Sequence, residues 1–367
     1  MERSRLSQDD LASRFPALPS WEDGTKLPTL KQLERFAQAT HTPIGYLLLP
    51  EPPQELLPVP DFRTIGDAEI GHASPDLLDT VYQCQQRQEW YRDYARVHQL
   101  TPVSFFGTFT VSMEVVEAAG QMSTVLSFAP EERGMTWSEA FRRLIEEADR
   151  HGVLVMVSGI VGSNTHRKLD PEEFRGFALA DELAPVIFVN GSDTKAAQIF
   201  TLAHELVHIW LGESAVSDTD MSSTPSNSTE RWCNEVAAEF LLPAAALQGV
   251  SVSQEDLTED LERLARQFKV STLVVLRRLF DAGFFTLPEY RIAYTDERAR
   301  ILALMEERSS DGGNFYNTQP VRVSKRFARA LIESTLEGQT LHRDAFQMLG
   351  FKKVSTFNEL AVRLGVA

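Results

Sequence analysis

Two histidines and a glutamate stand close together in this sequence and could carry out metal chemistry. His204 and His208 are four positions apart in the segment HELVH, and Glu205 directly follows the first of them. Residues four apart lie on the same face of an α-helix, so the two imidazoles could bind one metal ion. Glu205 could then reach a water molecule on that ion. The pattern predicts a hydrolytic zinc site.

A catalytic zinc site needs a third protein ligand, and the next predicted helix, at 229–242, offers three carboxylates. These are Glu230, Glu235 and Glu239. Glu230 is preferred because Asn234 shares its helix face and could orient a ligand histidine. Glu235 and Glu239 are rivals that would ordinarily be solvated helix charges. Two histidines with one glutamate form a ligand set typical of catalytic zinc.

The helix predicted to carry the histidines, at 196–212, has clear boundaries. Asp193 or Thr194 is suited to begin it as the N-cap, and Gly212 is suited to end it. Its other residues are mostly apolar, which indicates burial. A histidine pair on a buried helix can also be purely structural, so this alternative stays open from the pattern alone.

Both predicted helices resemble segments of the ImmA/IrrE family of metallopeptidases. The resemblance rests on FTLAHELVHIWLG and ERWCNEVAAEFLLP, and it extends to PTLKQLERFAQATHTPIGYLLLPEPP, EEFRGFALADELAPVIFVN and GGNFYNTQPVRVSKRFARALIESTLEGQTLHRDAFQMLGFKK. It implies Zn²⁺ as cofactor, with His204, His208 and Glu230 as ligands. It also implies that Glu205 is the general base.

The resemblance implies two classes of function. In the first, a zinc endopeptidase of narrow specificity cleaves a repressor or an antitoxin and so switches transcription or a stress response. In the second, the chain is an antitoxin-like regulatory protein that binds and neutralises a toxin, such as a PIN-like ribonuclease. The two functions do not exclude each other, and self-association as a homodimer is also open.

The strand predicted within Phe174–Asp181 is the candidate for peptide binding, because a substrate could add to it if it lies at the sheet edge. His166 and Arg175 lie near this strand in the sequence. Either could stabilise an oxyanion or contact substrate. Each could equally be a surface or structural residue.

Length and composition limit the class of protein. A chain of 367 residues can form two or three domains. No run approaches the roughly 18 apolar residues of a membrane helix, and the first residues lack a signal-peptide core. Cys84 and Cys233 are too few for a disulfide framework, and Cys233 falls near the apolar side of its helix. These features predict a cytoplasmic protein that does not contact membranes.

The predicted fold is α+β and mostly helical, with a zincin-like metallopeptidase core that contains a small sheet. The strand-like runs are VLVMVSG, EFRGFALAD and APVIFVN. The predicted division of the chain is a truncated XRE-like helix-turn-helix segment at 1–49, a proline-rich linker at 50–74, the peptidase domain at 75–287 and a helical C-terminal domain at 288–367.

The N-terminal segment departs from a complete DNA-binding unit. Ser7 and Thr29 are suited to cap two helices. Between these helices, SRFPALPS is too short and too rich in proline for a full recognition helix. Six Lys and Arg offset six Asp and Glu in residues 1–49, and the net charge of the chain is −16. DNA binding is therefore doubtful, and a packing or docking module is the alternative.

One stretch near the C-terminus is locally basic. The charge there could be a solvated helix face or a contact for an acidic partner. Its residues are Arg322, Lys325, Arg326 and Arg329.

Overall fold

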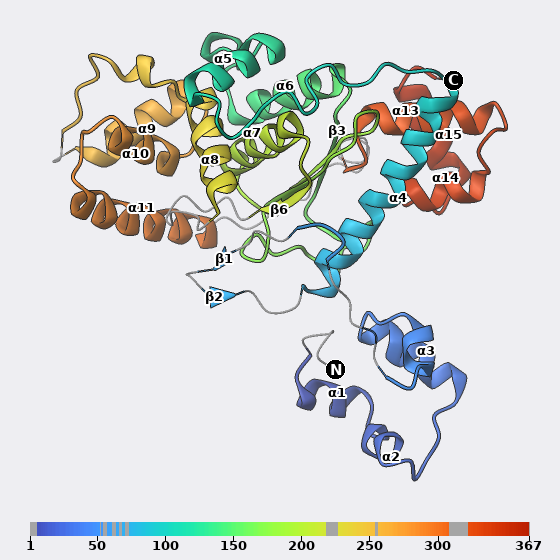
Figure 1. The fold of residues 1–367 in the computed structure, drawn as a ribbon. Coiled ribbons are helices and arrows are strands. Elements are labelled where there is room, and N and C mark those ends of the chain that lie inside the picture. Colours follow the sequence, from blue (N-terminus) through green and yellow to red (C-terminus); the bar gives the residue numbers. More distant parts are fainter. Residues whose placement is uncertain are drawn as a thin grey trace.

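The computed structural model describes most of the chain. The described residues are 6–51, 53, 57–60, 64–65, 68–69, 73–217, 227–253, 256–307 and 322–366. Helices surround one small mixed sheet (Figure 1), and this confirms the predicted α+β class. No helix of the described part is both long and apolar enough to cross a membrane.

The central sheet has the strand order β3-β5-β4-β6. Strands β3 and β5 are parallel, whereas β4 is antiparallel to both β5 and β6. The first three strands lie where the sequence predicts them and are buried throughout, because helices cover both faces of the sheet. The bounds are β3 (Leu154–Ser158), β4 (Gly176–Leu179), β5 (Val186–Asn190) and β6 (Ala215–Ser217).

Strand residues alternate between two hydrophobic cores, as the two-residue period of a strand requires. Val155 and Val157 of β3 face the first core, and Leu154 and Met156 face the second. The first core includes side chains of α5 (Val115–Leu126), α6 (Trp137–Arg150), α7 (Lys195–Leu211), α8 (Ser228–Leu241), α9 (Leu257–Phe268), α10 (Thr272–Asp281) and α11 (Leu287–Glu307). The second includes side chains of α4 (Pro75–Val97), α13 (Lys325–Leu336), α14 (His342–Leu349) and α15 (Val354–Arg363).

The prediction that Phe174–Asp181 provides an edge strand is wrong. Strand β4 lies inside the sheet, because β6 pairs with its outer side with Phe177 opposite Val216. The chain leaves α7 through Gly212, whose φ of +73° is in the left-handed region, and returns at once beside β4. The amide of Val216 also donates to the carbonyl of Pro60, so β6 contacts the linker at this residue.

The N-terminal segment forms three short helices that lie below the sheet in Figure 1, namely α1 (Gln8–Arg14), α2 (Leu18–Glu22) and α3 (Leu30–Ala39). Ser7 and Thr29 cap α1 and α3 as predicted. Helix α2 has only five residues, in keeping with the proline-rich sequence before it. The rings of Phe15, Trp21 and Phe36 pack together and form much of a small core.

Shorter elements complete the described part. They are the helical turns η2 (Ile44–Leu48), η3 (Pro130–Glu132) and η4 (Ala244–Leu247), and the paired strands β1 (Thr64–Ile65) and β2 (Ala68–Glu69).

Candidate metal centre

Helix α7 positions the histidines of the HELVH segment. Its N-cap is Thr194, whose hydroxyl accepts the amide of Ala197, and its C-cap is Gly212. Both assignments agree with the sequence. His204 and His208 are fully buried, and their helix packs against α8. Because they are one turn apart, their rings lie side by side on the face directed at α8.

Three side chains meet between α7 and α8. The Nε2 atoms of His204 and His208 are 3.1 Å apart. Glu230, near the start of α8, places Oε2 3.2 Å from the first and Oε1 3.0 Å from the second. Tetrahedral ligands at zinc distances of about 2.0–2.1 Å are about 3.3 Å from one another. The three side chains therefore have the spacing of zinc ligands, and no other group of this kind occurs among the described residues.

The electrostatics of the site favour the protonation states that metal ligands require. Burial lowers the pKa of His204, so its imidazole is neutral. For Glu230, burial acts to raise the pKa, but the neighbouring His204 and His208 outweigh it and hold the pKa well below its usual range. A neutral His204 beside an ionised Glu230 can accept a divalent cation without either group first losing a proton.

Asn234 lies on α8, about one helical turn after Glu230. Its side chain acts on His204 as a hydrogen-bond partner that raises the pKa of the imidazole. In the present rotamers, however, His204 Nδ1 and Asn234 Oδ1 are both buried and neither makes a hydrogen bond of normal geometry. The pair fits the predicted role, in which an amide oxygen orients the ring of a ligand histidine, and that role stays a prediction.

The rival ligands lie elsewhere. Glu239 is bound to Arg278 and accepts the amide of Ala244, and Glu235 is half-buried outside the cluster. Burial raises the pKa of the Cys233 thiol well above its usual range, which disfavours the thiolate a metal would need.

Replacement of Glu230 by Gln should weaken zinc binding, because the amide removes the negative charge that faces both imidazoles. We expect a loss of affinity of about 100-fold or more. The matched control is Glu235→Gln on the same helix, which should bind zinc like the wild type. Competition with a chromogenic chelator measures both affinities. If Glu235→Gln is the variant that loses zinc, the third ligand has been assigned to the wrong carboxylate.

The general-base candidate, Glu205, is also fully buried. The backbone of β4 runs directly past it. A methyl group placed on Gly176 would lie 3.3 Å from Glu205 Oε1. The same methyl group would lie 2.5 Å from Thr201 Cγ2 and 2.8 Å from the Phe188 carbonyl oxygen. A glycine is therefore required where β4 and α7 approach each other, and the sequence did not reveal this.

The variant Gly176→Ala should be less stable than the wild type by about 1–3 kcal/mol, the usual cost of overpacking a core. Urea denaturation followed by circular dichroism measures this difference. Gly120→Ala is the control, because nothing lies within 4 Å of the added methyl group. In the middle of α5 it should stabilise the protein slightly. Equal stability of the two variants would mean that β4 can move away from α7 without cost.

The two substrate-binding candidates are placed differently. Arg175 is the residue before β4, and its Nε lies 3.8 Å from a carboxylate oxygen of Asp193, which is close to the start of α7. His166 is on an exposed loop. It lines an open cavity of about 570 Å³ together with residues of the N-terminal helices. It has no hydrogen bond or ion pair with the three ligand residues in the described part.

This geometry agrees with comparisons to known protein families. Residues 148–280 match the Peptidase_M78 model, described as the IrrE N-terminal-like domain. The match supports the resemblance to the ImmA/IrrE family. Residues 323–363 match a second model, described as a domain of unknown function, DUF8813. No curated protein and no solved structure matches the chain.

The region similar to the IrrE N-terminal-like domain begins within α6 and ends within α10. It therefore contains the whole sheet of β3–β6 and both helices of the metal cluster. The N-terminal helices and α4 lie outside the matched residues, and the helices α13–α15 fall within the second match.

Proposed function

We propose that the chain is a zinc-dependent endopeptidase that cleaves a regulatory protein. The observation that supports this most strongly is the cluster of His204, His208 and Glu230. Its ligand atoms are 3.0–3.2 Å apart, and it lies within a region similar to a peptidase family.

Each residue has a defined part in this reaction. A zinc ion held by the three ligands would supply Lewis acidity, which polarises a peptide carbonyl and makes water more acidic. Glu205 would accept a proton from the attacking water and then deliver it to the leaving amine. Asn234 would keep the ring of His204 in place. Because the groups are buried, their charges act in a medium of low polarity, where electrostatic stabilisation is stronger.

The packing around the site favours narrow specificity. His204, Glu205 and His208 are all inaccessible to solvent in the described structure. The flank of β4 that an extended peptide could pair with is occupied by β6. A substrate must therefore pair with another part of the site or displace β6, and few proteins would do so. This is the behaviour expected of an enzyme that cleaves one repressor or antitoxin.

A second candidate is the antitoxin-like binding function. It is favoured by exposed apolar side chains of the N-terminal segment, since such groups on a small unit indicate a contact surface. They are Leu27, Leu30, Leu48 and Leu49. In this function the segment would cover a toxin, and DNA binding would be secondary.

The peptidase is tested on a proteome from the source cell. Protein loaded with one equivalent of zinc should produce new N-termini at a small number of sites, as found by labelling of terminal amines. Chelation should abolish these cleavages, and renewed addition of zinc should restore them. If the zinc-loaded and chelated proteins give the same termini, the chain is not a peptidase under these conditions and the binding function is favoured.

A further inference from the structure

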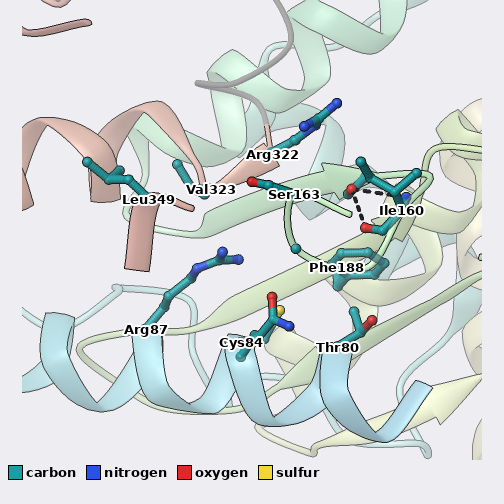
Figure 2. Close-up of a pocket in the computed structure, with 12 residues that line it drawn as sticks. Thr80, Cys84, Arg87, Ile160, Ser163, Phe188, Arg322, Val323 and Leu349 are labelled. Carbon is teal, nitrogen blue, oxygen red and sulfur yellow. Dashed lines mark hydrogen bonds between the residues drawn. The ribbon is translucent and has the colours of Figure 1, made fainter. Parts of the chain in front are cut away.

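A small pocket separate from the metal cluster lies between α4, the loop after β3 and the residues before α13 (Figure 2). It has about 10 Å³ of space for the centres of water-sized groups. That is room for about one such group. No Asp or Glu lines it, although the chain as a whole has a net charge of −16.

Arg87 extends from α4 into this pocket (Figure 2). Its side chain is only 8% exposed. Its Nε donates to the carbonyl of Met348, and Nη1 contacts the sulfur of Met156 at 3.6 Å. No carboxylate in the described part pairs with it, and burial lowers its pKa. A buried guanidinium with only neutral partners is costly, and an anion would compensate it.

Arg322 lies at the opposite rim of the pocket (Figure 2). It belongs to the basic stretch noted in the sequence, whose other members have partners. Lys325 pairs with Glu146, Arg326 donates to the Tyr91 hydroxyl and the Asp149 carbonyl, and Arg329 pairs with Glu333. Arg322 alone of the four makes neither a hydrogen bond nor an ion pair with another described residue. Burial lowers its pKa as well.

Uncharged donors surround the same space. The amide of Gln83 lines the pocket and has no hydrogen-bond partner in the described part. The backbone amides of Gly162 and Ser163 also donate to no described group. Gly162 has a φ of +54°, and consecutive free amides next to a left-handed residue are typical of anion sites. The nearby acids Asp76 and Asp79 do not neutralise the pocket, because both are bound to Arg167.

We propose that this pocket binds the phosphoryl group of a small ligand, with Arg87 and Arg322 as its cationic partners. A guanidinium group donates strong, charge-assisted hydrogen bonds to phosphate oxygens. The available space admits one oxygen, so the rest of the ligand remains at the mouth, beside Arg322 and Ser163. The source of the group is either free phosphate or a phosphate ester.

Such a ligand would connect two parts of the chain that are far apart in sequence. Arg87 already bonds to the end of α14, and the Ser163 hydroxyl donates to the Gly350 carbonyl. The pocket is thus a junction between the central sheet and the C-terminal helices. A bound anion should stabilise this junction and raise the melting temperature of the whole chain.

The test uses full-length protein stripped of zinc, so that phosphate cannot act through the metal cluster. Melting temperature is recorded from 0 to 50 mM inorganic phosphate at constant ionic strength, and titration calorimetry gives the Kd. We expect saturable stabilisation of the wild type and at least a tenfold weaker Kd in Arg322→Gln. The matched control is Arg329→Gln, which should bind like the wild type. A second titration uses adenosine monophosphate in place of inorganic phosphate. If the ligand of this pocket is a phosphate ester, adenosine monophosphate should bind more tightly than inorganic phosphate.

Two further variants keep the test decisive if one fails to fold. Gln83→Ala removes a half-buried donor without a charge change, and Arg87→Lys keeps the charge but removes the guanidinium fork. Both should weaken binding. The proposal is overturned if phosphate leaves the wild-type melting temperature unchanged, if Arg322→Gln binds as tightly as the wild type, or if acetate stabilises the protein as strongly as phosphate.

Discussion

Replacing His208 with Ala should reduce the zinc content of the purified protein from about one ion per chain to nearly none. The remaining groups, His204 and Glu230, would leave a two-ligand site. Two ligands hold zinc far less tightly than three. Without His208, the remaining ligand atoms would be His204 Nε2 and Glu230 Oε2, which lie 3.2 Å apart. Elemental analysis after gel filtration gives the stoichiometry. Wild-type protein that contains no zinc, and takes up none when it is added, would contradict the assignment of the site.

The control for this experiment is His98→Ala, which removes an exposed histidine at the end of α4 and should leave zinc content unchanged. Stability gives a second measurement. Zinc binds only the folded chain at this site, so its loss should lower the melting temperature by an amount that grows with zinc concentration. His208→Ala should melt at the same temperature with and without added zinc.

The same site should make the zinc-free protein sensitive to acid. The pKa values of His204 and Glu230 are both lower in the folded chain than in an unfolded chain. Protonation of either group therefore favours unfolding. Stability of the zinc-free protein should fall as the pH decreases below about 6.5 and continue to fall below about 4.3, the ordinary values of the two groups.

The central elements could be predicted from the sequence because their signals are local. The β-branched runs that form β3 and β5 and the cap residues Thr194 and Gly212 depend only on neighbours in the chain. The spacing of His204 and His208 fixes their common helix face for the same reason. The choice of Glu230 as the third ligand depends on how α8 packs on α7, which is not a local property. The four-residue spacing between Glu230 and Asn234 gave only an indirect signal for this choice.

Features that depend on distant contacts could not be predicted. Strand β6 has only three residues, too few for a two-residue period to be recognised, and it forms because Gly212 returns the chain beside β4. The requirement for glycine at position 176 comes from Thr201 and Phe188, which approach it from other elements. Likewise, Arg322 is distinguished from the neighbouring basic residues only by the partners that the fold gives to them.

Glu205→Gln separates the two functional classes and should have the largest effect on activity. In a peptidase the carboxylate moves the proton, and loss of a general base usually reduces the rate by about 10²–10⁴-fold. Cleavage of the cellular target should therefore fall to the detection limit. In an antitoxin-like binder, α7 serves as scaffold, and the same variant should neutralise the toxin as well as the wild type.

The substitution is suited to this purpose because Gln has nearly the volume of Glu and all three ligand side chains remain. Zinc content should be unchanged, and the melting temperature should remain within a few degrees of the wild type, since the buried carboxylate is replaced by a neutral amide. The control Glu235→Gln makes the same chemical change on α8, outside the cluster, and should cleave normally. With folding and zinc intact, lost activity is attributable to the missing base. If Glu205→Gln instead supports the full cellular function, proteolysis is not the main function and the chain acts by binding its partner.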